Sequence, residues 1–462
     1  MEIRMTEGRL SKQILLFSIP LILSNLLQVL FNMADIAVVG QFSGAEALGA
    51  VGSTVILVGV FTGFLIGVGS GVNALCARLI GAEDDAALKK NVHSSLIICV
   101  IVGAILAVTG VAATNFMLRL LGTKDELFDG AALYLHIYFL GMPALAVYNY
   151  GNGVMSAAGN TKTPLFYLAA AGIMNVVLNV VFVVGLGMSV DGVAIASIIS
   201  QYFSAFMIVR YLLKSQSAYA LRMSDMRLYK GYAEKVLALG VPSGVQNAIF
   251  QIANLFIQRA LNSFPAVVVE GNSAAANADA LVYDVMAAFY MACASFMSQN
   301  IGALKRKRVT QSYFICLAYS FFSAAVMGCA LVLFGKEFLA IFTRDAAVAD
   351  AGMYRLKIMG LSYAVSAFMD CTIAASRGIG KTVVPTAIVI LGSCVFRVVW
   401  VYTVFAHFRT ITSLYLLYVF SWSITAAAEI VYFAVCYRRM RLDGEVCDGS
   451  QRRVLLTVCN RE

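Results

Sequence analysis

Charged residues are scarce in this sequence of 462 residues. Asp, Glu, Lys and Arg together supply 13% of it, whereas about a quarter is usual for a soluble domain. Hydrophobic residues make up 60%. A chain with so little charge and so many apolar residues is predicted to be a polytopic integral membrane protein.

Other absences exclude whole classes of function. The three histidines (His93, His136 and His407) are far apart, so a metal centre has little support. The ten cysteines are scattered and none forms a Cys-x-x-Cys motif, so we expect small buried side chains rather than redox or metal ligands. No G-x-x-x-x-G-K-[ST] loop occurs, and the soluble segments are too short for an ATPase domain. No cluster of catalytic side chains presents itself, so we expect neither an enzyme nor a cofactor.

Long apolar runs recur along the chain. A membrane-spanning helix needs about 20 apolar residues, and lipid excludes unpaired backbone polar groups. We therefore predict an all-α integral membrane protein with twelve transmembrane helices, centred near residues 26, 60, 102, 143, 175, 202, 248, 287, 324, 366, 397 and 425. The charged N-terminal segment is followed by no small-residue cleavage site, so we predict a cytoplasmic lead-in rather than a cleaved signal.

The formal net charge of +9 is concentrated on one side of the predicted membrane. Most of the 34 Lys and Arg residues fall at the N-terminus, in alternate loops and in the C-terminal tail, and they include the run Lys305–Arg308. Arg397 is the one basic residue that this reading places inside a span. The positive-inside pattern predicts a multi-pass protein of the cell membrane with both termini in the cytoplasm. Basic patches are then expected to contact lipid, not nucleic acid.

The two halves of the sequence resemble each other. Pro20, Asn25 and Asn32 recur 222 residues later, as Pro242, Asn247 and Asn254. Further matched segments are LIGA at 79–82 with NIGA at 300–303, and LGTKD at 121–125 with FTRD at 342–345. Six spans followed by six homologous spans predict two lobes related by a pseudo-twofold axis along the membrane normal, a plan typical of transporters.

The repeat gives predicted boundaries. We predict an N-terminal six-helix lobe (1–213), a cytoplasmic linker (214–235), a C-terminal six-helix lobe (236–437) and a cytoplasmic basic tail (438–462). We expect the chain to act as a monomer within the lipid bilayer.

Polar side chains form a stripe inside the first span. Asn25, Gln28, Asn32 and Asp35 are spaced 3, 4 and 3 apart, which places them on one helical face. Other polar residues of the first lobe that we expect to line a cavity are Asn152, Asn175, Asn179 and Ser200. For any single Asn or Ser, a hydrogen bond between helices is the alternative role. An intramembrane carboxylate costs about 2.5–3.5 kcal/mol, so Asp35 is predicted to be functional.

The second lobe carries a similar stripe that includes Asn254, but Ile257 occupies the position equivalent to Asp35. Its acids lie on other spans: Asp279, Asp284, Asp370 and Glu429. We expect Glu429 and Arg397 to form a salt bridge, because a lone acid and a lone base near mid-membrane most simply pair.

These acids indicate that the protein handles cations. A carboxylate at low dielectric can hold or release a proton near neutral pH, and when ionised it can coordinate Na⁺ or pair with an organic cation. The predicted spans contain several acids but only one Arg. This excess of acidic residues favours small organic cations as the cargo and Na⁺ or H⁺ as the coupling ion. Asp35, Asp279, Asp284 and Asp370 are the predicted ion-coupling residues.

The sequence resembles the multidrug and toxic compound extrusion (MATE) family over about residues 10 to 440. The resemblance rests on FNMADIAVVGQFSGAEALGAVG at the end of the first span, ARLIGAEDDAALKK after the second and AAGNTKTP after the fourth. In the second half it rests on GVPSGVQN and FMDCTIAASRGIGK. It implies a V-shaped pair of six-helix lobes that export cationic, amphipathic drugs in exchange for Na⁺ or H⁺.

The resemblance also assigns roles to single residues. Asp35 and Asn175 match polar residues of the family's first-lobe cavity, and Asp370 matches an acid of its second-lobe cation site. Asp35, Asn175 and Asn179 are thus a candidate Na⁺ site. The family often has Asp at the position of Asn179, and many members have Glu near Phe250 or Gln251. Asp279 and Asp284 are candidates to replace those acids.

Two other transporter classes are the alternatives. A lipid-linked oligosaccharide flippase of the same superfamily would carry anionic lipids, so several cavity Arg or Lys and often two extra helices are expected. The single intramembrane Arg and the twelve spans predicted here disfavour it. A major-facilitator transporter also has six plus six spans but normally carries a G-x-x-x-D-R-x-G-R-R type loop after its second span, which ARLIGAEDDAALKK does not resemble.

Overall fold

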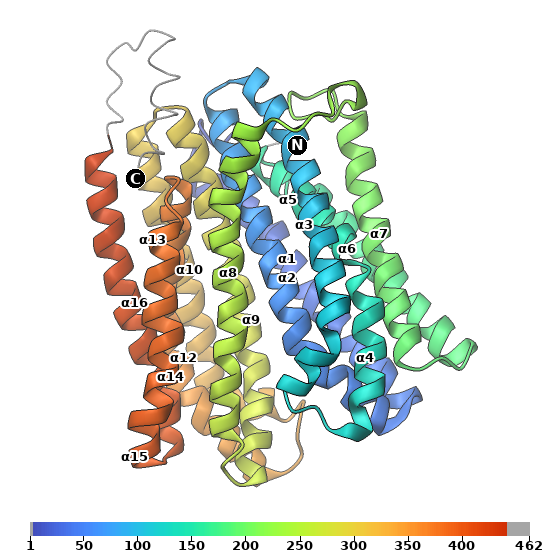
Figure 1. The fold of residues 1–462 in the computed structure, drawn as a ribbon. Coiled ribbons are helices and arrows are strands. Elements are labelled where there is room, and N and C mark those ends of the chain that lie inside the picture. The colour runs from blue at the N-terminus through green and yellow to red at the C-terminus, as the bar shows by residue number, and fades with distance from the viewer. Residues whose placement is uncertain (1–2, 441–462) are drawn as a thin grey trace. The chain divides into compact units, whose positions relative to one another are not determined.

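A computed structural model describes residues 3–440, and these residues are almost entirely helical, with no strand among them (Figure 1). The α-helices are α1 (Leu10–Phe42), α2 (Gly44–Gly81), α3 (Asp85–Leu120), α4 (Asp125–Phe139), α5 (Met142–Ala157), α6 (Lys162–Asn179), α7 (Val190–Lys214), α8 (Lys230–Leu261), α9 (Ala266–Gly302), α10 (Arg306–Leu333), α11 (Gly335–Leu339), α12 (Ala346–Gly378), α13 (Val383–Val389), α14 (Phe396–Trp400), α15 (Ala406–Phe408) and α16 (Ile411–Arg439). Shorter helical segments are η1 (Val180–Gly185), η2 (Met223–Asp225), η3 (Ile390–Val395) and η4 (Val401–Phe405).

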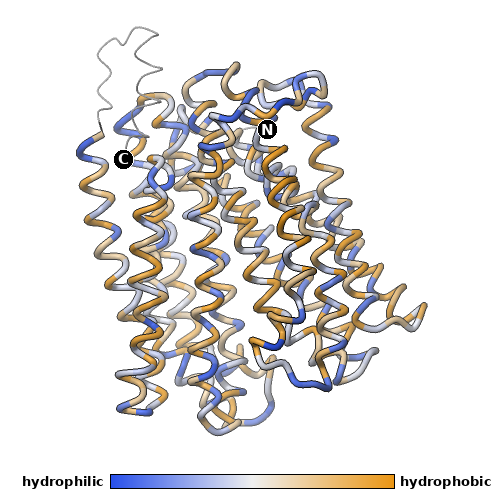
Figure 2. Tube along the Cα trace, in the orientation of Figure 1, coloured by the Kyte–Doolittle hydropathy of each residue, from blue (hydrophilic) through white to orange (hydrophobic). Residues whose placement is uncertain are grey.

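The prediction of twelve membrane spans is confirmed for this part of the chain. Ten continuous helical runs are long and apolar enough to cross a bilayer, and two bent pairs bring the number to twelve. The helices are mainly apolar, and hydrophilic segments gather near their ends and in the loops (Figure 2). Of the basic tail predicted at 438–462, residues 441–462 lie outside the described residues.

The repeat is visible in the irregularities of the helices. The first bent pair, α4 and α5, turns by 48° just before Pro143, and the second bend, of 47°, divides α12 between Gly360 and Ser362. These bends fall in the fourth and tenth spans, at corresponding places of the two repeats. The π-helical segments η1 and η4 also correspond, because each lies near the end of the apolar span that follows such a bend. Local backbone geometry therefore repeats along with the sequence.

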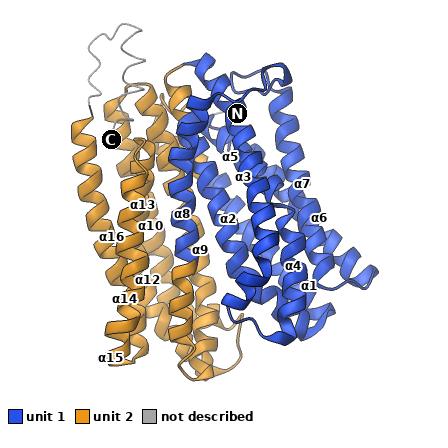
Figure 3. Cartoon of the chain, in the orientation of Figure 1, with its two compact units in different colours: residues 1–3, 19–76, 84–251 blue, residues 4–18, 77–83, 252–462 orange. Residues whose placement is uncertain are grey.

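The chain forms two compact units (Figure 3). Among the described residues, unit 1 comprises residue 3 and residues 19–76 and 84–251, and unit 2 comprises residues 4–18, 77–83 and 252–440. These units differ from the sequence halves 1–213 and 236–437, because the ends of α1 and α2 pack in unit 2 and most of α8 packs in unit 1. The chain thus passes between the units within helices and not in the predicted linker.

Glycines explain why α8 packs in unit 1. A Cβ at Gly67 of α2 would lie 2.2 Å from the backbone nitrogen of Gly244, and one at Gly71 would lie 2.5 Å from that of Gly240. Two Gly-x-x-x-Gly pairs therefore let the backbones of α2 and α8 approach closely, as small residues do in membrane helices. A larger side chain at any of the four positions would push the helices apart.

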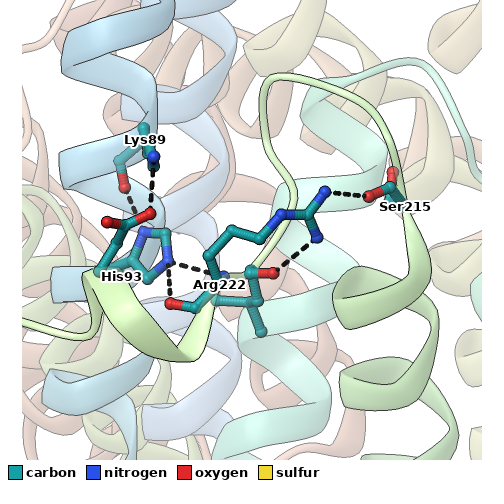
Figure 4. Close-up of polar contacts among 6 residues, drawn as sticks. Lys89, His93, Ser215 and Arg222 are labelled. Carbon is teal, nitrogen blue, oxygen red and sulfur yellow. Dashed lines mark hydrogen bonds and ion pairs between the residues drawn. The ribbon is translucent and has the colours of Figure 1, made fainter.

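The linker between α7 and α8 is fixed to the first turns of α3 within unit 1 (Figure 4). His93 Nε2 accepts a hydrogen bond from the backbone N–H of Arg222 at 3.0 Å, and His93 Nδ1 lies 2.7 Å from the carbonyl oxygen of Lys89. The Arg222 guanidinium donates to the carbonyl of Ser215 at 2.9 Å, satisfying the C-terminal end of α7. Lys89 pairs with Asp225 at 2.6 Å, and this contact lowers the pKa of the Asp225 carboxyl. The linker is therefore a docked segment of unit 1.

The N-terminal segment is held in unit 2. The guanidinium of Arg308 on α10 donates to the backbone carbonyls of Met5, Glu7 and Gly8 at 2.9–3.0 Å. Met5 is fully buried beneath this contact. From residue 4 onward, the predicted lead-in is thus packed as part of unit 2.

The cysteines agree with the sequence analysis. All eight in the described part of the chain are free thiols, and six of them are buried: Cys76, Cys99, Cys293, Cys316, Cys371 and Cys394. The other two cysteines of the sequence, Cys447 and Cys459, lie outside the described residues.

Candidate functional site

Four polar side chains in unit 1 form a closed ring of hydrogen bonds. Asn179 Nδ2 donates to Asp35 Oδ1 at 2.5 Å and lies 3.3 Å from Asn175 Oδ1. Asn175 Nδ2 donates to Ser197 Oγ at 3.4 Å, and Ser197 Oγ donates to Asp35 Oδ2 at 3.5 Å. The two asparagines share a face of α6 because they are four residues apart. We call these four residues the Asp35 ring.

The Asp35 ring is largely buried. Asn179 is 0% exposed, Asn175 6% and Ser197 8%, while Asp35 is half-buried. Asn179 Oδ1 is buried and has no hydrogen-bond partner in the described part of the chain. Within residues 3–440, no ion pair involves Asp35. A carboxylate thus lies among neutral groups without a basic residue to balance its charge.

The chemistry of the Asp35 ring suits a small hard cation. Carboxylate, amide and hydroxyl oxygens converge here, and such oxygens are the ligands that hard cations prefer. No group of three or more His, Cys, Asp or Glu side chains that could hold a metal occurs in the described residues, so the ring offers a single negative charge. The structure brings together the predicted set of Asp35, Asn175 and Asn179, and their binding of Na⁺ stays a prediction.

Other residues predicted for the first cavity are not part of the ring. Gln28 and Asn32 are exposed on α1, Asn152 accepts a hydrogen bond from Ser156, and Ser200 donates to the carbonyl of its own helix at Ala196. The exposed Asn254 of α8 belongs to unit 2. Substrate binding by these residues stays a prediction. Ser197 completes the ring, and it lies on the same polar helix as Ser200. Its contact with Asp35 could not be predicted from local sequence, because the two residues are 162 positions apart.

In unit 2, Asp279 of α9 is an ion-pair partner. Its carboxylate accepts hydrogen bonds from the guanidinium of Arg355 and the hydroxyl of Tyr363, both on α12. Arg355 also donates to Asn272 Oδ1 at 2.6 Å, and its guanidinium lies 5.2 Å from the ring centre of Tyr415. The predicted coupling residue Asp279 is therefore already paired with a buried cation.

The prediction that Arg397 is the one basic residue inside a span is wrong. Arg355 lies within the first segment of α12 and is 6% exposed. The sequence analysis centred this span near residue 366, which left Arg355 beyond its end. The helix instead runs 33 residues from Ala346 and bends, so its first segment is also apolar and packed.

The predicted salt bridge between Glu429 and Arg397 is not formed. Both carboxylate oxygens of Glu429 are buried without a hydrogen-bond partner in the described residues, and the cation whose charge acts on Glu429 is Arg377. Arg397 instead donates to Ser421 Oγ at 3.2 Å, and its charge acts on Asp370. The predicted pair was wrong because the spans of unit 2 contain further arginines that hydropathy alone did not place there.

Asp370 lies on the second segment of α12. The charges of Arg377 and Arg397 both act on it, and its Oδ2 atom is buried without a hydrogen-bond partner in the described chain. Asp284 is half-buried on α9, and its charge acts on Tyr290. The coupling roles predicted for these two acids stay predictions.

The fold and these two polar centres define a class of protein: a multi-pass helical membrane protein built from two repeats, each with ionisable groups held inside its helices. The MatE family model matches residues 20–181 and 242–403, two blocks that begin at Pro20 and Pro242. The chain therefore belongs to the MatE family. Members of this family are transporters and not enzymes, so the resemblance seen in the sequence is confirmed.

Curated relatives agree with this assignment. The probable multidrug resistance protein YpnP of Bacillus subtilis is 28% identical over 361 residues, covering 78% of this chain and 80% of YpnP. The FAD transporter of Shewanella oneidensis is 24% identical over 359 residues, covering 77% of this chain and 79% of that protein.

Solved structures share the fold. An outward-facing multidrug resistance MATE family transporter of the MOP superfamily has a TM-score of 0.87 at 22% identity, covering 95% of this chain and 98% of that chain. A MOP superfamily transporter from Pyrococcus furiosus has a TM-score of 0.86, also at 22% identity and with the same coverage.

Proposed function

We propose that this protein exports cationic, amphipathic compounds by antiport with Na⁺ or H⁺, and that the coupling ion binds at the Asp35 ring. One observation carries the proposal: the Asp35 carboxylate accepts hydrogen bonds from two neutral side chains, Asn179 and Ser197, and forms no ion pair in the described chain. A negative charge kept inside a membrane helix without its own counter-ion requires a cation from outside the protein.

Antiport follows if the coupling ion and the organic cation compete for the negative charge of Asp35. A proton or Na⁺ on Asp35 neutralises the carboxylate, and an organic cation near unit 1 then loses its electrostatic attraction. A ligand shifts an equilibrium only through its different affinities for two states, and here each cation favours the state that lacks the other. Ion entry and cargo release are coupled in this way without any covalent step.

Helix α1 is well suited to transmit ion binding. It carries Asp35 within unit 1, whereas its first residues up to Ser18 belong to unit 2. Pro20 lies two residues past this transition and removes one hydrogen bond of the helical ladder. A change at Asp35 can therefore bend or repack α1 near Pro20.

We also propose that the protein lies in the cell membrane with both termini in the cytoplasm, and that one chain is sufficient for transport. The positive-inside distribution of Lys and Arg supports this orientation. The docked linker, with Lys89 and Arg222, and the N-terminal segment at Arg308 would then face the cytoplasm.

The proposal is tested in proteoliposomes loaded with a cationic dye such as ethidium. Transport is measured under an imposed Na⁺ gradient and, separately, under an imposed pH gradient. We expect one gradient to drive dye movement by the wild type and neither to drive it with Asp35→Asn. The matched control is Asp129→Asn, the same substitution at an exposed position of unit 1. Transport by Asp35→Asn at the wild-type rate would contradict the proposal.

An anionic cargo is the second candidate. Three arginines lie in the spans of unit 2, at positions 355, 377 and 397, and one relative is an FAD transporter. Because only one such Arg was predicted, these arginines weaken the case against a flippase or another anion carrier. Because each arginine acts on an acid of the same unit, we favour a cationic cargo. Dye transport that FAD does not inhibit would support this choice, and transport of FAD alone would overturn it.

A further inference from the structure

Asp279 joins the two segments of α12 to α9 within unit 2. It accepts one hydrogen bond from Arg355, which precedes the bend of α12, and another from Tyr363, which follows it. The bend of 47° lies between Gly360 and Ser362. One carboxylate of a neighbouring helix therefore holds both sides of a break in a membrane helix.

Arg355 is anchored too firmly to act as an exchangeable counter-ion. Besides Asp279, it donates to Asn272 of α9 at 2.6 Å. Its guanidinium also lies 5.2 Å from the ring centre of Tyr415 and 5.7 Å from that of Tyr418, both on α16. An incoming cation would have to displace a buried guanidinium with contacts to α9 and α16. This makes Asp279 a poor ion site and a good structural anchor.

The bend coincides with a close helix crossing. A Cβ at Gly328 of α10 would lie 1.9 Å from the carbonyl oxygen of Gly360, and one at Gly360 would lie 2.9 Å from that of Gly328. The glycines fix where α12 crosses α10, and the contacts of Asp279 hold the segments on either side. Asp370 lies on the second segment, so its position depends on the bend.

We propose that Asp279, Arg355 and Tyr363 are positioning residues that clasp the bend of α12 and so place Asp370 within unit 2. The clasp itself binds no transported ion. Its effect on transport rests on the proposed function, whereas its effect on the helix does not.

The first measurement is a distance that is independent of transport. Spin labels at positions 350 and 381 lie on opposite sides of the bend, near the two ends of α12. Asp279→Asn and Arg355→Gln should each lengthen the distance between the labels. Full straightening of a 47° bend would add about 3 Å at 1.5 Å per residue. The double variant should lengthen it no further than either single variant, because all three break the same contact.

The second measurement separates a clasp from an ion ligand. Tyr363→Phe keeps the ion pair and the aromatic ring but removes one hydrogen bond to Asp279. It should fold like the wild type and lower the maximal rate of dye transport, as expected for Asp370→Asn, with the KM for the coupling ion unchanged. In the same dye assay, Asp279→Asn and Arg355→Gln should also lower the maximal rate and keep the wild-type KM.

Two results would overturn the proposal. One is an unchanged label distance in both Asp279→Asn and Arg355→Gln. The other is loss of ion dependence in Asp279→Asn while Arg355→Gln and Tyr363→Phe keep the wild-type KM, which would make Asp279 an ion ligand. If dye transport proves not to be ion-coupled at all, the proposed function fails, and the label distances still decide whether the clasp exists.

Discussion

The two units hold their buried acids in opposite ways. In unit 1, Asp35 is surrounded by the neutral side chains of Asn175, Asn179 and Ser197. In unit 2, Asp279 pairs with Arg355, and the charges of two further arginines act on Asp370 and Glu429. Buried charges that are compensated within the protein serve structure, whereas an uncompensated one is available to a cation from outside. The comparison therefore supports the proposal of coupling at Asp35 in unit 1 and favours a positioning role for the Asp279–Arg355 pair in unit 2.

This difference arises between two copies of one repeat. Ile257 stands in the second repeat where Asp35 stands in the first, and the acids of unit 2 lie on α9, α12 and α16. The shared helices and bends thus support different electrostatics. The following substitutions test this difference between the acids of unit 1 and those of unit 2.

The largest effect is expected at Asp35. Asp35→Asn removes the charge but keeps the shape of the side chain, so the variant should insert and fold while efflux of a cationic dye falls to background. Dye efflux in whole cells and the amount of inserted protein are measured together, with Asp129→Asn as control. Efflux by Asp35→Asn that still responds to the ion gradient would move coupling away from unit 1.

A large loss of stability is expected when one partner of the unit 2 pair is removed. Arg355→Met leaves Asp279 buried without its cation, and breaking such a pair costs about 3–5 kcal/mol. Asp279→Leu combined with Arg355→Met should recover most of this loss, since apolar replacement of a whole pair is often neutral. Thermal unfolding in detergent measures both. Equal instability of the single and double variants would show that the pair is not internally compensated.

A smaller functional effect is expected at Asp370. Asp370→Asn should lower the rate of dye transport but leave its dependence on the coupling ion, because the charges of Arg377 and Arg397 act on this acid. The dye assay under the two imposed gradients separates the effects. Complete loss of ion dependence would place a second coupling site in unit 2.

The smallest effect is expected at Ser197. Ser197→Ala removes one weak, 3.5 Å hydrogen bond to Asp35. A bond of this kind contributes about 0.5–1.5 kcal/mol, so the apparent affinity for the coupling ion should fall roughly 2–10-fold. Ser200→Ala is a matched control, because Ser200 bonds only to its own helix. Equal effects of both substitutions would argue that the Asp35 ring does not bind the ion.

The repeat and the membrane spans could be predicted from the sequence because both depend on local patterns, namely apolar runs and matched short segments. Apolar runs of helical length gave twelve spans, and Pro20 with Pro242 marked the starts of the two family matches. Part of the site was predictable for the same reason. Asn175 and Asn179 share a helical face by spacing alone, and Asp35 is conspicuous as a carboxylate in an apolar helix.

The remaining features depend on contacts between distant residues. Asp279 and Arg355 are 76 residues apart, and hydropathy placed Arg355 outside its span because the bend of α12 hides the length of the helix. The packing of α8 in unit 1 depends on a contact of the same kind. The crossing of Gly67 with Gly244 joins α8 to unit 1, and nothing local in the sequence indicates it.

The most direct test of the contrast observes the carboxyl groups themselves. Infrared difference spectra of the purified protein, recorded on addition of Na⁺ and on lowering of the pH, report changes of carboxyl bands as an ion or proton binds. The account predicts an ion-dependent carboxyl signal that Asp35→Asn removes and Asp279→Asn retains. A signal that survives Asp35→Asn and disappears with Asp279→Asn would contradict it.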